Sequence, residues 1–493
     1  MCGVVGIKLR ESVEKPQAAA LALTMLMRLQ HRGQDGAGIS FLDKQNQFKT
    51  LKGLGLIDQA FRGFDPAEFE SQTRLAVAHT RYATTGTGGV AELQPFVDGT
   101  PRVAMAHNGN IVNTAELVEK LNLVTHGLSD LEVLQQTFLN SLKKGGGPDE
   151  WLSTLMNEFN GSFSVVAALQ SGEILGWRDS FGLRPLFFAE FAEGWAFASE
   201  THSIAALGVE NKIESVEPGG YVFVDSSGTV KRGKLVSTKN PKSQKKFCMF
   251  EAVYFSNPQS EFMTDSNKLQ SVYRSRFSLG SELAKFISGQ IKSGEYDYVV
   301  PVPETSRTAA VAVAEGLKIP YREFLIKNPY VSRTFILNSQ EARLRALKNK
   351  LSLVGPEIKD KRILLVDDSV VRGNTSRLMA ERLREAGATS VGLASTCPPI
   401  KHGCFYGIDF PDPKELVAAR FENHSDICKS LGVNALFYLP QEALTRALGT
   451  ENLCMACLDG NYPTRDSSFE RFLELRKSHR ITAAGRSSSG GLT

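Results

Sequence analysis

The chain has 493 residues, of which 42% are hydrophobic and 22% charged, with a formal net charge of +4. This length allows two large or three small domains, and the composition is ordinary for a globular protein. The small net charge argues against a general nucleic-acid-binding protein. No apolar run of about 18 residues predicts a membrane span. No basic segment followed by an apolar stretch predicts secretion, so we expect a cytoplasmic protein.

The first half of the chain predicts short strands with few long helices. Residues 2–8 form an apolar strand, residues 16–29 have a helical apolar face, and residues 30–36 are polar and rich in glycine. Many short strands predict two packed sheets with helices outside. Further strands are predicted at residues 75–79, 103–107, 163–169, 195–199 and 221–224.

A polar, basic stretch at residues 231–246 predicts a domain boundary. We therefore divide the chain into domains at residues 1–234 and 235–483. Residues 484–493 are rich in serine and glycine, and we expect a disordered tail there.

The second half alternates apolar strands with longer helices. Residues 298–301 and 362–366 are continuous apolar runs, as expected for strands buried on both faces of a parallel sheet. A helix at 376–386 and a strand at 390–394 complete a strand–loop–helix–strand unit. This order predicts an α/β domain of the doubly wound type.

The strongest local pattern is RILLVDDSVVRGNTS at residues 362–376. Asp367 and Asp368 follow the strand at its carboxyl end, where open α/β sheets bind ligands. The turn after them offers hydroxyls, backbone N–H groups and a helix N-terminus to a phosphate. The acids suit ribose hydroxyls or Mg²⁺, although a capped helix with solvated acids would show a similar pattern. The candidate phosphate-binding residues are Ser369, Arg372, Gly373, Asn374, Thr375 and Ser376.

The chain begins Met1-Cys2-Gly3. If Met1 is removed, one residue carries both a thiol and an α-amine that titrates at about 7.7–8.0 and can act as its base. Any presequence would bury this start. A thiolate attacking an amide needs donors for the developing oxyanion, and Asn108 with the Gly109 N–H is a reasonable pair.

A glutamine substrate also needs partners for its charged groups. Arg81 suits the α-carboxylate and Asp130 suits the α-amine. Taken singly, an Asn-Gly pair is a common turn, and such charges are usually solvated.

Seven cysteines without a secretory signal predict thiols or metal ligands rather than disulfides. A CxxC pair, Cys454 and Cys457, together with the distant Cys248 and Cys404 could bind zinc or an iron–sulfur cluster. Buried or surface thiols remain the alternative. Cys397 and Cys428 stand in no ligand context, and we expect them to be structural.

The stretch 362–376 resembles the fingerprint of the type I phosphoribosyltransferases, which use phosphoribosyl pyrophosphate (PRPP). The resemblance implies that Asp367 and Asp368 hold the ribose and metal and that the following turn holds the 5-phosphate. The segment PVPETS at residues 301–306 resembles the pyrophosphate side of that site. There Thr305 matches a position associated with Mg²⁺.

The first 230 residues or so resemble the N-terminal-nucleophile (Ntn) glutamine amidotransferases, through the MCG start, QHRGQDGAGI and HNGNIVN. The resemblance implies a four-layer αββα sandwich with Cys2 as nucleophile. It also implies an oxyanion hole at Asn108 and Gly109 and glutamine binding by Arg81 and Asp130. Arg32 matches a further active-site position, where we expect it to contact glutamine.

Together, the two halves resemble the amidophosphoribosyltransferase family, as do FEAVYFS, KNPYVSRTF and YGID. This implies conversion of glutamine, PRPP and water to 5-phosphoribosylamine, glutamate and pyrophosphate, the first committed step of purine synthesis. It further implies an enclosed path for ammonia, feedback inhibition by purine nucleotides and a homo-oligomer, either dimer or tetramer. One branch of the family carries a [4Fe–4S] cluster in cysteine contexts that match Cys248, Cys404, Cys454 and Cys457.

We expect a lid at residues 327–345, where Pro329 and Ser332 replace the family's usual arginine and glycine. Asn257 and Gln259 also differ from the usual arginine and aspartate. Two other functions were considered. Another Ntn amidotransferase, such as the enzyme making glucosamine 6-phosphate, would lack the 362–376 pattern, and a catalytically silent PRPP-sensing regulator would not need the intact glutaminase residues.

Overall fold

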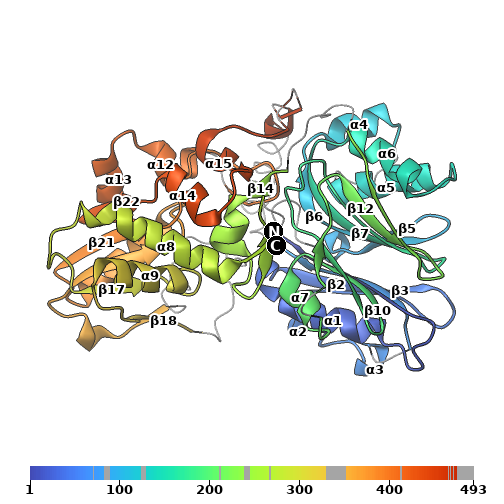
Figure 1. Ribbon diagram of the computed structural model, residues 1–493, viewed down its shortest axis with the longest axis horizontal. Helices are drawn as coiled ribbons and strands as arrows, with labels where there is room; N and C mark the ends of the chain where they lie inside the picture. Colours follow the sequence, from blue (N-terminus) through green and yellow to red (C-terminus); the bar gives the residue numbers. More distant parts are fainter. Residues whose placement is uncertain are drawn as a thin grey trace, which may run out of the picture.

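The computed structural model describes residues 1–69, 72–82, 89–123, 129–209, 212–237, 245–265, 268–328, 351–410, 413–464, 466, 468–469 and 471–474. Figure 1 shows two halves side by side, the first coloured blue to green and the second yellow-green to red. The expected tail at 484–493, Pro329, Ser332 and most of the expected lid lie outside these residues.

The first half contains two antiparallel sheets. One has seven strands in the order β11-β9-β10-β1-β4-β2-β3, and the other has six in the order β13-β12-β8-β7-β6-β5. The first sheet consists of β1 (Gly3–Leu9), β2 (Gly36–Leu42), β3 (Phe48–Leu54), β4 (Leu75–Arg81), β9 (Phe187–Phe191), β10 (Gly194–Ala198) and β11 (Glu214–Ser215). The second consists of β5 (Phe96–Asp98), β6 (Val103–Ile111), β7 (Gly161–Leu169), β8 (Ile174–Arg178), β12 (Gly220–Val224) and β13 (Val230–Lys234).

Helices cover the outer faces of both sheets. One apolar core joins α1 (Ala18–Arg28) and α7 (Thr201–Ala205) to the first sheet. Another joins α5 (Asp130–Leu142) and α6 (Pro148–Glu158), beside α4 (Thr114–Lys120), to the second. A third lies between the sheets, where Val4 and Val77 meet Ala106 and Val166. The predicted αββα sandwich is therefore confirmed, and the short helices α2 (Ile57–Ala60) and α3 (Pro66–Phe69) contribute to the same core as α1.

The second half is built on a four-stranded parallel sheet, β17-β20-β21-β22. Its strands are β17 (Tyr298–Pro301), β20 (Arg362–Asp367), β21 (Ser390–Ser395) and β22 (Ala435–Tyr438). One core includes α8 (Val272–Ser288), α9 (Arg307–Leu317) and α14 (Gln441–Leu448), and the other includes α11 (Asn374–Glu385) and α13 (His424–Leu431). Helices on both faces of a mainly parallel sheet confirm the predicted α/β class.

Three two-stranded pairs complete the second half: β14 (Phe247–Cys248) with β23 (Leu453–Cys454), β15 (Glu261–Met263) with β16 (Leu269–Ser271), and β18 (Leu325–Lys327) with β19 (Leu351–Leu353). A π-helix covers Glu251–Phe255, and short helices α12 (Val417–Arg420) and α15 (Ala456–Asp459) follow later. Among the helices described, none is long and apolar enough to cross a membrane.

Candidate active sites

Cys2 lies where the two sheets of the first half meet. It directly precedes β1, and its backbone nitrogen lies 3.2 Å from Oδ1 of Asn108 on β6. Its Sγ lies 4.0 Å from the carbonyl oxygen of Tyr82. Met1 is buried against the core of the second half, and burial lowers the pKa of its α-amine to about 5. The structure thus brings together the predicted nucleophile and the predicted oxyanion donor from distant parts of the chain.

The Asn108-Gly109 pair holds an unused donor. Asn108 is 1% exposed, and its Nδ2 has no hydrogen-bond partner within the described part of the chain. Gly109 has φ of 154°, and a Cβ there would lie 2.0 Å from the Ser162 carbonyl oxygen. Only glycine fits this close approach of β6 to β7. A buried amide donor beside a thiol suits stabilisation of an oxyanion.

Arg81 and Asp130 lie near this centre but have protein partners. Arg81 ends β4 and forms a 2.6 Å ion pair with Glu92. Asp130 begins α5, and its Oδ2 lies 3.1 Å from His107 Nε2. Burial acts to raise the pKa of Asp130, but the His107 charge and hydrogen bonds outweigh it and lower the pKa. Asp130 is therefore favoured as a carboxylate.

Arg32 is a buried link between the two halves. Its Nε donates to the Cys2 carbonyl at 3.0 Å, and its terminal nitrogens form ion pairs with Glu200 at 2.5 Å and Glu251 at 2.9 Å. Glu251 belongs to the π-helix of the second half. Although burial alone would lower the pKa of Arg32, these carboxylates raise it. Its side chain is thus engaged with the protein at the site where the sequence predicted contact with glutamine.

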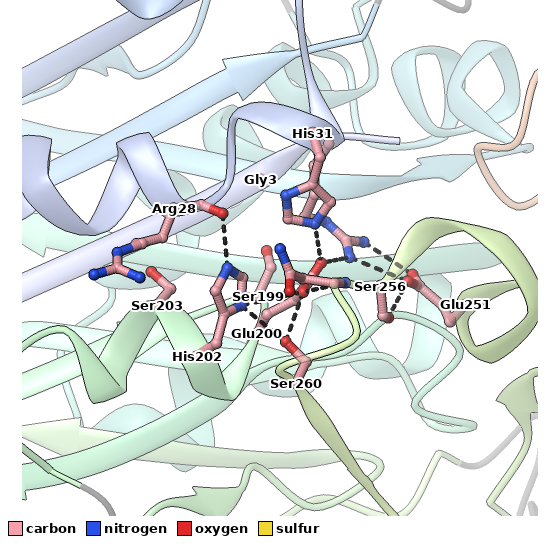
Figure 2. A network of polar contacts seen from close by, with 12 residues as sticks. Gly3, Arg28, His31, Ser199, Glu200, His202, Ser203, Glu251, Ser256 and Ser260 are labelled. Atoms are coloured by element: carbon pink, nitrogen blue, oxygen red, sulfur yellow. Dashed lines mark hydrogen bonds and ion pairs between the residues drawn. The ribbon is translucent and has the colours of Figure 1, made fainter. Parts of the chain in front are cut away.

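Figure 2 shows the polar contacts around Glu200 and Glu251. Glu200 also accepts hydrogen bonds from His31 at 2.8 Å and Ser260 at 2.7 Å. Burial would raise the pKa of Glu200, but the charges of His31 and Arg32 lower it well below its usual value. Neither acid was predicted from the sequence. Glu251 stands inside the FEAVYFS segment, whereas nothing local distinguishes Glu200.

Asp367 and Asp368 lie at the carboxyl end of β20, as predicted. They are 7% and 8% exposed, and Ser369 Oγ donates to Asp368 at 2.6 Å. Burial raises the pKa of Asp368 to about 6. Burial and the neighbouring acid raise the pKa of Asp367 well above its usual value. Two buried acids with raised pKa values form a site whose negative charge a cation would stabilise.

The predicted phosphate-binding turn leads directly into α11. Gly373 has φ of 78° and caps this helix, which begins at Asn374 and continues through Thr375 and Ser376. The helix N-terminus and the Gly373 turn together favour an anion. Arg372 instead forms a 3.1 Å ion pair with the exposed Glu415. The structure places the residues of the motif together but turns this arginine toward a protein carboxylate.

Thr305 lies at the same edge of the parallel sheet. β17 runs beside β20, and the Val302 N–H donates to the Val366 carbonyl at 2.8 Å. The segment carrying Thr305 therefore leaves the sheet next to Asp367. The expected lid begins at Lys327, the end of β18, which pairs with Leu351 of β19. Most of that lid lies beyond the residues that the structure describes.

The four cysteines predicted as ligands line one small cavity of about 10 Å³. Cys248 and Cys454 are register partners in the β14–β23 pair, and Cys457 follows in α15. No three histidine, cysteine or acidic side chains within the described ranges converge closely enough for a single metal ion. Cys397 and Cys428 do not line this cavity. The four predicted ligands thus converge on one cavity, together with Arg184.

Family models match each half of the chain. A glutamine amidotransferase domain matches residues 42–229, and a phosphoribosyl transferase domain matches residues 272–404. The amidophosphoribosyltransferase of Methanothermobacter thermautotrophicus is 36% identical, covering 94% of both chains. That of Pyrococcus horikoshii is 37% identical, covering 94% of this chain and 96% of its own. This chain belongs to the amidophosphoribosyltransferase family.

A solved amidophosphoribosyltransferase has the same fold. The glutamine PRPP amidotransferase of B. subtilis, complexed with ADP and GMP, superposes with a TM-score of 0.80 at 34% identity. The match covers 94% of this chain and 98% of that one. The chain is thus an amidophosphoribosyltransferase, an enzyme of purine biosynthesis. Its glutamine amidotransferase domain precedes its phosphoribosyltransferase domain.

Proposed function

We propose that this amidophosphoribosyltransferase releases ammonia from glutamine at Cys2 and transfers it to PRPP at the Asp367–Asp368 site. The products are 5-phosphoribosylamine, glutamate and pyrophosphate. The observation that carries the proposal is the pairing of Cys2 with Asn108, whose buried Nδ2 lacks a partner within the described chain. Such a donor serves an oxyanion that forms during the reaction.

The glutaminase step requires that Met1 has already been removed. The freed α-amine of Cys2 takes the thiol proton, and the thiolate adds to the glutamine amide carbon. Asn108 Nδ2 and the Gly109 N–H stabilise the resulting oxyanion. The Cys2 α-amine passes the proton to the departing nitrogen as the oxyanion collapses, so the carbon–nitrogen bond breaks and ammonia leaves. Water then hydrolyses the thioester to glutamate and restores the Cys2 thiol. Arg32 acts as a positioning residue, because it holds the Cys2 carbonyl rather than facing solvent.

Glutamine recognition uses two charged residues at the edges of this centre. Arg81 exchanges Glu92 for the substrate α-carboxylate, and its guanidinium can bind the new carboxylate in the same way. Asp130, which is ionised, binds the α-amine of glutamine. Exchange of one carboxylate for another keeps the arginine neutralised before and after binding.

In the PRPP site, Asp367 and Asp368 hold the ribose hydroxyls and Mg²⁺, together with Thr305. Ser369, Arg372, Gly373, Asn374, Thr375 and Ser376 surround the 5-phosphate. Ammonia attacks C1 of the ribose, and the bond to pyrophosphate breaks. Bound Mg²⁺ would neutralise charge on the departing pyrophosphate. The raised pKa values of the two acids support this assignment, because a cation would relieve their repulsion.

A [4Fe–4S] cluster would be held by Cys248, Cys404, Cys454 and Cys457, because these four thiols line one cavity. When bound, it would link the β14–β23 pair to the segment carrying Cys404 and so support the fold. The domain limits 1–234 and 235–483, a dimeric or tetrameric assembly and a cytoplasmic location complete the proposal. Inhibition by purine nucleotides is supported by a solved relative at 34% identity that is described as the allosteric regulatory enzyme of purine biosynthesis.

The decisive experiment compares the native protein with Cys2→Ala. We expect PRPP-dependent glutamate release from glutamine to disappear in the variant, while phosphoribosylamine formation from added ammonia continues. Undiminished glutamine-dependent turnover would refute Cys2 as nucleophile. Loss of both activities in a folded variant would show that Cys2 does not act in the glutaminase step alone. A silent regulator would show neither activity in the native protein.

A further inference from the structure

Arg184 reaches from the first half into the cavity lined by the four cysteines. It follows β8, is fully buried and lines the same cavity as Cys248, Cys404, Cys454 and Cys457. Its Nε donates to the Tyr406 carbonyl at 2.7 Å, and its own carbonyl accepts from Ser164 Oγ at 2.8 Å. Hydrogen bonds thus fix both the Nε and the backbone carbonyl of Arg184.

The Arg184 charge is only partly balanced by the protein. Its Nη1 lies 3.5 Å from Glu251 Oε1, while the same carboxylate accepts shorter bonds from Arg32 at 2.9 and 3.1 Å. Neither terminal nitrogen of Arg184 has a hydrogen-bond partner within the ranges that the structure describes. One buried carboxylate is therefore shared by two guanidiniums. A buried cation with incomplete hydrogen bonding is costly.

The thiols that line the cavity with Arg184 can supply the missing negative charge once they bind a metal group. Metal binding deprotonates cysteine ligands. An iron–sulfur core held by four thiolates carries a net negative charge. That charge would face the Arg184 guanidinium.

We propose that Arg184 is the counter-cation of an anionic iron–sulfur cluster held by Cys248, Cys404, Cys454 and Cys457. The inference rests on the proposed cluster but adds a residue from the other half of the chain. The thiolates come from the second half and the cation from the first, so the cluster links the two halves through charge. Arg184 is a positioning residue for the cluster and does not contact the reacting substrates.

The test compares native protein with Arg184→Met, which keeps length without charge, and Arg184→Lys, which keeps charge. All are purified anaerobically and mixed with an excess iron chelator without oxygen. We expect iron release from Arg184→Met to be about tenfold faster or more, the effect of losing a charged hydrogen-bonding partner. Arg184→Lys should release iron more slowly than Arg184→Met, since its ammonium still faces the cluster.

Thermal unfolding of the iron-free proteins separates this role from a merely structural one. Without the cluster, Arg184→Met should be at least as stable as the native protein, because a poorly paired buried cation has been removed. Equal iron release from native protein and Arg184→Met would overturn the inference while leaving the cluster intact. So would a loss of stability in iron-free Arg184→Met as large as in the loaded form.

If Arg184→Met does not fold, iron release from Arg184→Lys at the native rate supports the charge role, and release as fast as from denatured protein contradicts it. Iron-free native protein would overturn the cluster itself, whereas the Cys2 proposal is tested separately by glutamate release.

Discussion

The two candidate catalytic centres differ in how their buried charges are balanced. Around Cys2, Arg32 is buried between Glu200 and Glu251, so opposite charges meet within the protein. At the end of β20, Asp367 and Asp368 are buried side by side with like charge, and their pKa values are raised. The first centre is arranged before any substrate arrives, whereas the second favours a bound cation.

This difference follows from the chemistry proposed at each centre. An oxyanion forms during glutamine hydrolysis, and donors held in advance stabilise it without reorganisation. PRPP is strongly anionic and needs a metal to approach two carboxylates. The like charges of Asp367 and Asp368 are therefore balanced only when the metal binds.

Replacing Glu251 should have the largest effect on the balanced centre. Glu251→Gln removes a charge between buried Arg32 and Arg184, so we expect the free energy of unfolding to fall by about 3–5 kcal/mol. Chemical denaturation measures this loss. The matched control is Glu214→Gln, which breaks an exposed pair with Arg232 and should cost about 0–1 kcal/mol. Equal effects of the two substitutions would contradict the buried balance.

Asn108→Ala tests whether the first centre is organised for an oxyanion. Removing one donor should lower the glutamine-dependent kcat by about 10²–10³-fold. The ammonia-dependent rate should stay near the native value, because the second centre is untouched. Steady-state assays with each nitrogen source measure both rates. A parallel fall in both would show that Asn108 supports the fold rather than the oxyanion.

Asp368→Asn tests the unbalanced centre. Loss of one carboxylate should weaken binding of PRPP with Mg²⁺ by about tenfold to a hundredfold, the range for hydrogen bonds to charged groups. The substitution should also leave the substrate-free protein as stable as the native form or more so, because it removes repulsion with Asp367. Isothermal titration and thermal unfolding measure the two effects. A strongly destabilised substrate-free variant would contradict the view that this centre is strained by like charge.

The smallest expected effect is a pH dependence of Mg²⁺ binding. The pKa of Asp368 is raised from 3.8 to about 6 by burial, so the folded protein retains this proton between these values while the unfolded chain releases it. The stability of the metal-free protein should therefore fall as pH rises from about 4 to about 6. Mg²⁺ affinity should rise over the same interval, by at most about tenfold per pH unit, and level off above it. Asp368→Asn should flatten both profiles, and unchanged slopes would exclude Asp368 as the titrating group.

Local patterns were sufficient for much of the fold. The strand predicted at residues 195–199 is observed as β10, and the apolar run at 362–366 becomes β20 with one further residue. The helix predicted from residue 376 begins two residues earlier, at Asn374, because Gly373 caps it with a positive φ. Strand alternation and turn chemistry act between near neighbours, so they can be read from contiguous residues.

The chemical components of both centres can be identified from local sequence: a cysteine after Met1, an Asn-Gly pair, two acids before a glycine turn and four cysteines in distinct contexts. The partners of the charged residues around these components follow from the tertiary structure. It joined Arg32 to Glu200 and Glu251, turned Arg81 toward Glu92, and placed Arg184 against the cysteines. These contacts depend on how two sheets and two halves pack. Arg32 and Glu251, for example, are 219 positions apart and share no local period that reveals their pairing.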